Sequence, residues 1–192
     1  MRINEIFYSI QGEGANAGKP AIFVRLSGCN LKCPFCDTEH EPHVGMTVDE
    51  VIDAIKEYPS DLVVLTGGEP TLQGIEPLIQ KIHQIGKSVA IETNGTQPVP
   101  RGVDWITVSP KSSFVGERGK PVIDFATEVK VVFDGEHEPD DCGIASPHYY
   151  LQPCDTGDAE KNHDIISKLI EYVKGHPKWK ISLQTQKMLN VR

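Results

Sequence analysis

The chain has 192 residues, of which 39% are hydrophobic and 24% are charged, and its formal net charge is −8. This length fits one domain, 1–192, whose core is large enough to fold without a structural metal. The negative charge, with no basic run, argues against nucleic acid as a partner. No apolar run is long enough to cross a bilayer and the N-terminus lacks a secretory signal pattern, so we expect a cytoplasmic protein with no membrane partner.

Short apolar runs alternate with amphipathic helical patterns, an order typical of parallel strands joined by helical crossovers. The apolar runs predict strands at 21–26, 61–66, 88–93, 105–109, 128–133, 149–152 and 180–185. The helical patterns cover 47–58, 72–86 and 159–175, and the aperiodic stretch 110–124 is expected to be a loop. Together these elements predict an α/β fold.

The expected helices carry local start and stop signals. Thr47 and Glu50 have the spacing of a capping box, with an apolar helical face after them. Pro77 predicts a start or a kink inside the second helix. Gly86 and Gly175 are typical of residues that follow a helix C-terminus.

Polar residues follow strand after strand. They are T-G-G-E after Leu65, E-T-N-G after Ile91, S-P-K after Val108, Q-P-C-D after Leu151 and Q-T-Q-K after Leu183. In barrels of alternating strands and helices, the active site is built at the C-terminal ends of the strands. One polar ending would be an ordinary turn, but the repetition favours a shared site.

Three of the five cysteines, Cys29, Cys33 and Cys36, form the pattern C-x-x-x-C-x-x-C. In a reducing compartment, such clustering indicates metal ligation or redox chemistry. A tetrahedral zinc site would need a fourth ligand, and the spacing leaves open Cys142, Cys154, His40 or His43. A 4Fe-4S cluster held by three thiolates would instead leave one iron open to an outside ligand.

This cysteine loop resembles that of the radical S-adenosylmethionine superfamily, in which the methionine amino and carboxylate groups chelate the open iron. The G-G-E-P motif at 67–70 strengthens the resemblance, because glycines there let the backbone approach the methionine ammonium. The resemblance implies an abbreviated, partial TIM-like β/α barrel with mostly parallel strands. It also implies a 4Fe-4S cluster and S-adenosylmethionine as cofactors, with Cys29, Cys33 and Cys36 as cluster ligands.

Within the superfamily, the chain resembles the 7-carboxy-7-deazaguanine synthase family from end to end. The motifs are Y-S-I-Q-G-E-G, F-V-R-L-S-G-C-N-L-K-C-P-F-C-D-T, L-T-G-G-E-P, I-E-T-N-G, S-P-K, L-Q-P and Q-T-Q-K-M-L-N-V-R. The resemblance implies conversion of 6-carboxy-5,6,7,8-tetrahydropterin to 7-carboxy-7-deazaguanine with loss of ammonia, in the biosynthesis of 7-deazapurines such as queuosine. The adenosyl radical would take a substrate hydrogen and later return it, so S-adenosylmethionine would be reused.

The same resemblance implies roles for individual residues. Arg25 would grip the substrate carboxylate through its planar fork. Thr38 would contact Mg²⁺ through its hydroxyl, although its spacing alone fits a turn or cap equally well. The expected substrate-binding residues are Ile10, Gln11, Gly12, Glu13, Arg25, Thr66 and Arg192. The expected S-adenosylmethionine-binding residues are Phe35, Cys36, Asp37, Gly68, Ser109, Pro110, Lys111, Gln152, Pro153, Cys154 and Asp155.

One position departs from the family pattern. The usual ending is Q-T-H-K, and this chain has Gln186 where the histidine would be. An amide keeps a neutral hydrogen bond but does not donate a proton at physiological pH, so no acid-base role is assigned there.

The resemblance also implies a flavodoxin- or ferredoxin-type reductant and a homodimer. Two other functions remain open at this stage. One is a radical activating enzyme that generates a glycyl radical on a partner protein, because it would share the cysteines and the G-G-E motif. The other is a non-catalytic zinc or electron-transfer module.

Overall fold

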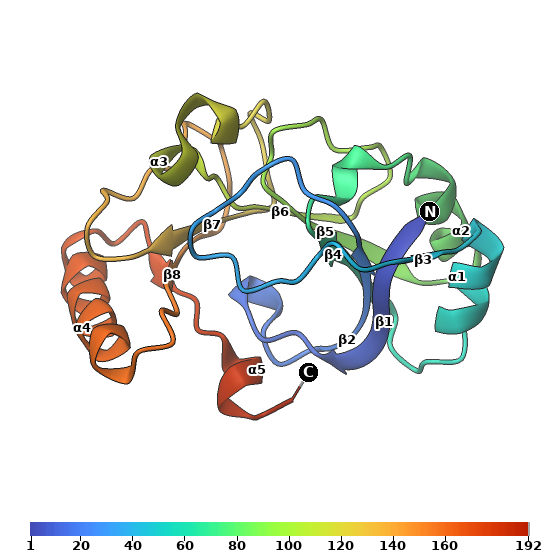
Figure 1. Cartoon of the computed structure of the whole chain (residues 1–192), viewed down its shortest axis with the longest axis horizontal. Coiled ribbons are helices and arrows are strands. Elements are labelled where there is room, and N and C mark those ends of the chain that lie inside the picture. Colours follow the sequence, from blue (N-terminus) through green and yellow to red (C-terminus); the bar gives the residue numbers. More distant parts are fainter. Residues whose placement is uncertain (192) are drawn as a thin grey trace.

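One nine-stranded sheet is the framework of the computed structural model, which describes residues 1–191 (Figure 1). The strands are β1 (Arg2–Ile10), β2 (Pro20–Leu26), β3 (Val44–Gly45), β4 (Leu62–Gly67), β5 (Ser88–Thr93), β6 (Trp105–Val108), β7 (Glu128–Phe133), β8 (Tyr149–Pro153) and β9 (Lys180–Ile181). Their order is β3-β1-β2-β4-β5-β6-β7-β8-β9. Strand β1 pairs antiparallel with β2 and β3, and all pairs from β2 to β9 are parallel. The predicted α/β, partial-barrel fold is confirmed.

Three longer helices connect the strands: α1 (Val48–Ile55), α2 (Glu76–Gln84) and α4 (Ala159–Gly175). The capping box of α1 forms as predicted, because Thr47 Oγ1 accepts from the Glu50 amide and the Glu50 carboxylate accepts from the Thr47 amide. Gly86 follows α2 with φ of 78°, a conformation that glycine adopts without steric cost. The predicted bounds of α4 match the structure.

Three expected elements need correction, and two strands were not predicted. Helix α2 begins at Glu76, which shortens the expected range 72–86 and confirms the start predicted at Pro77, since proline is accommodated in the first turn. The expected loop 110–124 contains α3 (Ser112–Val115) and the 3₁₀ helix η3 (Gly116–Gly119). The last expected strand ends at Ile181, and α5 (Thr185–Met188) begins within its range. Strands β1 and β3 were not predicted; they extend the parallel sheet by antiparallel pairing of β1 with β2 and of β3 with β1.

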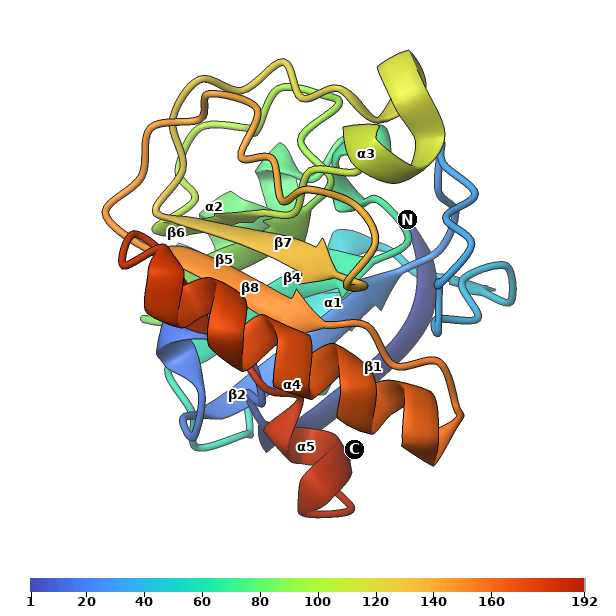
Figure 2. The same ribbon diagram turned by 90° about the vertical axis from the view of Figure 1, so that its left-hand side faces the viewer.

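The outer face of the sheet is covered by helices at two places (Figures 1 and 2). Helices α1 and α2 bury apolar side chains such as Ile55, Leu78 and Ile82 against β2, β4 and β5. Helix α4 buries Ile165 and Leu169 against the β7–β8 part of the sheet. Helices therefore close the outer face and leave the inner face free to form a site.

Along the inner face, side chains change from apolar to polar toward the C-terminal ends of the strands. Ala21, Phe23, Val64 and Ala90 form a small apolar layer at its base. Because successive side chains alternate between faces, the next inward residue of β2 after Phe23 is Arg25. Arg25 pairs in register with Thr66 of β4, and Glu92 pairs with Thr107 of β6. The polar strand endings therefore meet on one face, as predicted.

Candidate active site

A cavity of about 740 Å³ opens at the polar end of the inner face. Most of the predicted site residues line it: Ile10, Gln11, Gly12, Glu13, Arg25, Cys29, Cys33, Phe35, Cys36, Asp37, Thr38, Thr66, Gly68, Ser109, Lys111, Gln152, Pro153, Cys154 and Asp155. Pro110 is buried and does not line the cavity. Arg192 lies outside the described residues. The structure thus brings the predicted cofactor and substrate residues together, and their individual roles remain predictions.

The cysteine loop leaves β2 and crosses the centre of the view in Figure 1. Its base is closed where the Gly28 amide and the Ser27 hydroxyl both donate to the carbonyl of His40, at 2.8 and 2.7 Å. Cys29, Cys33 and Cys36 are free thiols on this loop. Burial raises the pKa of Cys29 and Cys33, and the negative charges of neighbouring thiolates raise both further. Three thiols grouped closely enough to affect one another fit the ligand set of a cluster.

The donor set does not fit a single zinc ion. Within residues 1–191, no three cysteine, histidine, aspartate or glutamate side chains meet at a point that would hold one metal ion. Cluster ligands bind different irons, so their sulfurs do not need to meet at one point. Of the four candidates for a fourth zinc ligand, Cys142 and His43 do not line the cavity, whereas His40 and Cys154 do. The sulfur of Cys142 lies 3.1 Å from the Ser112 hydroxyl. The arrangement therefore favours the cluster over tetrahedral zinc.

The G-G-E motif packs directly on the cysteine loop. A Cβ atom on Gly68 would lie 2.2 Å from the carbonyl oxygen of Gly28. The glycine is therefore required by the close approach of two protein backbones, whatever contacts a ligand makes. Gly68 and Glu69 donate backbone hydrogen bonds to Leu26 and Gly28, at 3.1 and 2.9 Å.

Glu69 is fully buried and fixes the ends of two strands. Its carboxylate accepts hydrogen bonds from the Thr93 hydroxyl and from the backbone N–H of Asn94, both at 2.7 Å. It also caps the 3₁₀ helix η2 (Pro70–Leu72) by accepting from the Thr71 amide. With these donors in place, the third residue of G-G-E is a structural anchor between β4 and β5.

The cavity also holds a buried charge cluster, of which Glu13 was predicted and Lys130 was not. Glu13 forms an ion pair with Lys130 of β7 and accepts from the amides of Gln184 and Gln186, at 3.0 and 3.1 Å. Burial alone would raise the pKa of Glu13, but the Lys130 charge and these hydrogen bonds lower it to about 2. Glu13 is therefore a fixed anionic acceptor. Lys130 follows Glu128 at strand spacing, which is the one sequence signal of an inward-facing cation.

Further polar side chains lie between this charge cluster and Arg25. Glu92 of β5 accepts from Gln11 Nε2 at 2.9 Å and from the Thr66 hydroxyl at 3.4 Å. Arg25 Nε donates to Glu5 at 2.8 Å, and its guanidinium lies 5.9 Å from the ring centroid of Phe7. Glu92, Glu5 and Phe7 were not predicted. This part of the cavity therefore presents one cation, Arg25, next to the carboxylates of Glu5 and Glu92.

On the cysteine side, Lys111 and Phe35 form a second group. Lys111 donates to the Ser109 hydroxyl, and its ammonium lies 5.7 Å from the ring centroid of Phe35. Burial lowers the pKa of Lys111 to about 8, with a further contribution from the Lys130 charge. The ring of Phe35 packs edge-on against Phe114 of α3, 4.6 Å between centroids. Helix α3 therefore supports the cysteine loop from outside.

The C-terminal helix α5 closes the side of the cavity next to Gly12. Thr185 donates from its amide and its hydroxyl to the Gly12 carbonyl, at 3.1 and 2.8 Å. Gln186 Oε1 is buried, has no hydrogen-bond partner among the described residues, and occupies the space where a Cβ atom on Gly12 would lie. The same Cβ would lie 2.8 Å from the backbone nitrogen of Gln186, so the position of the α5 backbone also favours glycine at position 12.

A partial β/α barrel with three free cysteines in the loop after β2 defines a radical S-adenosylmethionine enzyme. The model of the radical SAM superfamily matches residues 23–114. Among curated proteins, the 7-carboxy-7-deazaguanine synthase of Bacteroides thetaiotaomicron is 46% identical over 100% of this chain and 98% of the relative. That of Haemophilus influenzae is 38% identical over 100% of this chain and 94% of the relative. The chain therefore belongs to the 7-carboxy-7-deazaguanine synthase family.

A solved structure supports the same assignment. The crystal structure of QueE from Escherichia coli matches with a TM-score of 0.68 and 25% sequence identity, covering 95% of this chain and 93% of that chain. Family membership excludes the non-catalytic zinc or electron-transfer module. It also places the chain outside the glycyl-radical activating enzymes.

Proposed function

We propose that this enzyme converts 6-carboxy-5,6,7,8-tetrahydropterin to 7-carboxy-7-deazaguanine and ammonia, as a carbon–nitrogen lyase of 7-deazapurine and queuosine biosynthesis. The observation that carries the proposal is one cavity lined by two kinds of group. Three free thiols line it together with Arg25 and the buried carboxylate of Glu13. The full-length similarity to enzymes of this name supports the same reaction.

The substrate side matches the polar groups of a carboxylated pterin. The Arg25 guanidinium would bind the substrate carboxylate by paired hydrogen bonds. An aminopyrimidinone presents N–H donors that suit the anionic Glu13 and the neighbouring backbone of Gly12, with Gln11 and Thr66 beside them. Arg192 is proposed to contribute from the end of the chain, and Ile10 to pack along the ring.

On the other side, Cys29, Cys33 and Cys36 would hold the 4Fe-4S cluster. Residues proposed to line the S-adenosylmethionine site are Phe35, Asp37, Gly68, Ser109, Pro110, Lys111, Gln152, Pro153, Cys154 and Asp155. When bound, the cluster and S-adenosylmethionine supply the hydrogen abstraction that starts the rearrangement. The chain itself would position the substrate carbon and limit access of water, with Phe35 and Phe23 as apolar lining of the cavity.

Four further features belong to the proposal. Thr38 would contact Mg²⁺; its hydroxyl lies 3.5 Å from the Asp37 carboxylate, and a pair of oxygen ligands suits a hard cation. A flavodoxin or ferredoxin would reduce the cluster. The enzyme would act as a cytoplasmic homodimer. No helix within residues 1–191 is both long and apolar enough to span a membrane.

The decisive experiment is mass spectrometry of an anaerobic reaction. It contains cluster-loaded protein, reductant, Mg²⁺, S-adenosylmethionine and the carboxytetrahydropterin. We expect 7-carboxy-7-deazaguanine in excess over any 5′-deoxyadenosine, because the cofactor is reused. The Cys36→Ser variant is the negative control. Release of 5′-deoxyadenosine with no deazaguanine would show that the radical machinery works and that the proposed substrate is wrong.

A further inference from the structure

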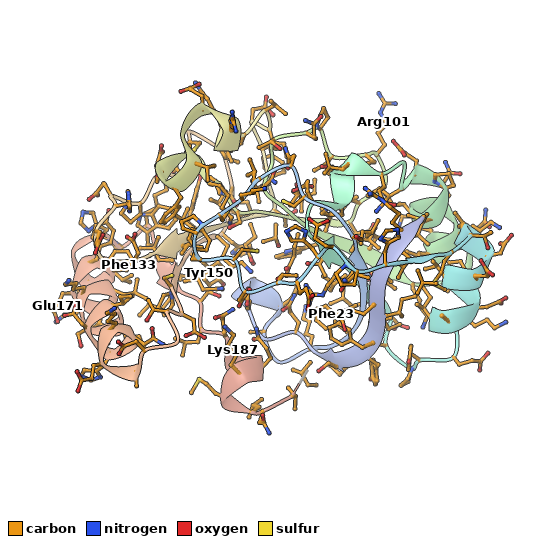
Figure 3. The ribbon with its side chains drawn as sticks, in the orientation of Figure 1. Phe23, Arg101, Phe133, Tyr150, Glu171 and Lys187 are labelled. Atoms are coloured by element: carbon orange, nitrogen blue, oxygen red, sulfur yellow. The ribbon has the colours of Figure 1, made fainter. Side chains whose placement is uncertain are left out.

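Helix α5 and the residue before it contact both the substrate-binding and the cofactor-binding segments through four consecutive residues, 184–187. Figure 3 labels Lys187 on this helix, and Figure 2 shows α5 below α4 near the end of the chain. The residues of α5 and the residue before it are joined to segments that lie far away in sequence. This short helix is therefore the place where the two proposed binding sites are physically connected.

The first contact is with the substrate side. The amides of Gln184 and Gln186 donate to the same Glu13 oxygen, and Thr185 donates twice to the Gly12 carbonyl. Glu13 is buried and is also paired with Lys130, so its position is determined by several donors at once. A ligand that orders the stretch containing Gly12 and Glu13 would therefore order α5 as well.

The second contact is with the cofactor side. The Lys187 ammonium donates to Asp37 at 2.9 Å and to Asp155 at 2.8 Å. Asp37 follows the third cysteine directly, and Asp155 lies just after β8. One lysine thus joins the cysteine loop to the strand end that is expected to bind S-adenosylmethionine.

We propose that Lys187 is a positioning residue that couples the binding of S-adenosylmethionine to the binding of the pterin, by holding α5 against both sides of the cavity. The inference rests on the proposed function, since it uses both ligands. Binding of either ligand further restrains the segments that α5 contacts, so the second ligand binds a site that has less motion left to lose. By thermodynamic linkage, each ligand must then tighten the other by the same factor.

The expected size of the coupling follows from the exposure of the ion pairs. The side chains of Lys187, Asp37 and Asp155 keep 40%, 55% and 35% of their accessible surface. Solvent partly screens ion pairs of this exposure, so their contribution to the coupling free energy is modest. We therefore expect S-adenosylmethionine to tighten pterin binding by about two- to fivefold, and removal of the Lys187 charge to bring that ratio close to one.

Anaerobic calorimetry on protein with the oxidised cluster tests this, because no turnover occurs without reductant. The dissociation constant of the carboxytetrahydropterin is measured with and without S-adenosylmethionine for wild type, Lys187→Met and Lys187→Arg. We expect the ratio of the two constants to fall to about one in Lys187→Met and to return part of the way to the wild-type ratio in Lys187→Arg. Lys168→Met is the matched control, since Lys168 pairs with Asp164 on α4 far from the cavity lining. The same ratio in wild type and Lys187→Met would overturn the proposal.

Hydrogen exchange tests the role of Lys187 independently of the proposed substrate. S-adenosylmethionine alone should slow amide exchange in 184–191 of wild type and should leave the exchange of that segment unchanged in Lys187→Met. If the pterin does not bind but this protection is seen, the proposed substrate is wrong and the link between Lys187 and the cofactor side stands. If the protection is absent in wild type, the proposed coupling is wrong, whatever the substrate.

Discussion

Glu13 and Lys130 form a buried ion pair across the cavity, although 117 positions separate them in the chain. Glu13 follows β1, and Lys130 lies in the middle of β7. The pair therefore joins the antiparallel start of the sheet to its parallel second half. It also holds in place the Glu13 carboxylate, which we propose accepts hydrogen bonds from the substrate.

Removing Lys130 should destabilise the folded protein. In Lys130→Met, the Glu13 carboxylate stays buried without its counter-ion, which costs about 3 kcal/mol in the free energy of unfolding at neutral pH. Urea unfolding followed by circular dichroism measures the loss. Lys56→Met, which removes an exposed ion pair with Asp53, is the control and should unfold as wild type does. Equal stability of the two variants would contradict the prediction.

Acid should destabilise the folded protein through protonation of Glu13. Burial works to raise the pKa of Glu13, but the Lys130 charge and three hydrogen bonds lower it from 4.5 to about 2. Because the folded pKa lies below the unfolded value, the stabilisation is complete above about pH 5 and is lost as the pH falls toward about 2. Between about pH 6 and about pH 2.5, wild type should lose about 2 to 3 kcal/mol more than Glu13→Gln. Parallel pH profiles in urea unfolding of cluster-free protein would disprove this.

Adding one methyl group at Gly68 should damage the cofactor side. The new Cβ would meet the Gly28 carbonyl at 2.2 Å, so either the G-G-E segment or the cysteine loop must move. We expect Gly68→Ala to lose about 1 to 3 kcal/mol of stability and to bind S-adenosylmethionine more weakly. Gly45→Ala serves as control, since nothing lies within 4 Å of the corresponding Cβ position. The two variants are compared by thermal unfolding and equilibrium dialysis.

Loss of one cluster thiol should abolish iron binding and keep the fold. Cys36 is exposed and lies in an irregular segment, so its replacement by serine removes no packing. After anaerobic reconstitution, Cys36→Ser should contain little iron and acid-labile sulfide, whereas Cys142→Ser should match wild type. Full iron content in Cys36→Ser would mean that another residue is the third ligand.

Exchanging Arg25 for lysine should weaken substrate binding. Lysine keeps the charge but not the planar fork, so one of two charge-assisted hydrogen bonds to the substrate carboxylate is lost. We expect KM for the carboxytetrahydropterin to rise about tenfold or more. The affinity for S-adenosylmethionine should stay within about twofold of wild type. A normal KM would remove Arg25 from the proposed substrate site.

Local features of the chain were predictable because they depend on neighbouring residues. The capping box at Thr47, the end of α2 before Gly86 and the bounds of α4 each follow from short-range hydrogen bonds or backbone conformation. Strand β1 was missed, since its pairing with β2 depends on a contact rather than on a local pattern. The strand expected at 180–185 begins at Lys180 as predicted but ends at Ile181, because Gln184 and Thr185 bind Glu13 and Gly12 instead of a neighbouring strand.

The spacing of Cys29, Cys33 and Cys36 and the end-to-end motifs were enough to identify the class of enzyme, because cluster ligands lie within one short loop. The tertiary structure alone decided that Lys130 pairs with Glu13, that Glu92 accepts from Gln11, and that Lys187 joins Asp37 to Asp155. These contacts join side chains that the chain keeps far apart. They exist because the order of strands in the sheet, which no local pattern encodes, brings the polar ends of β1, β5, β7 and β8 to one cavity.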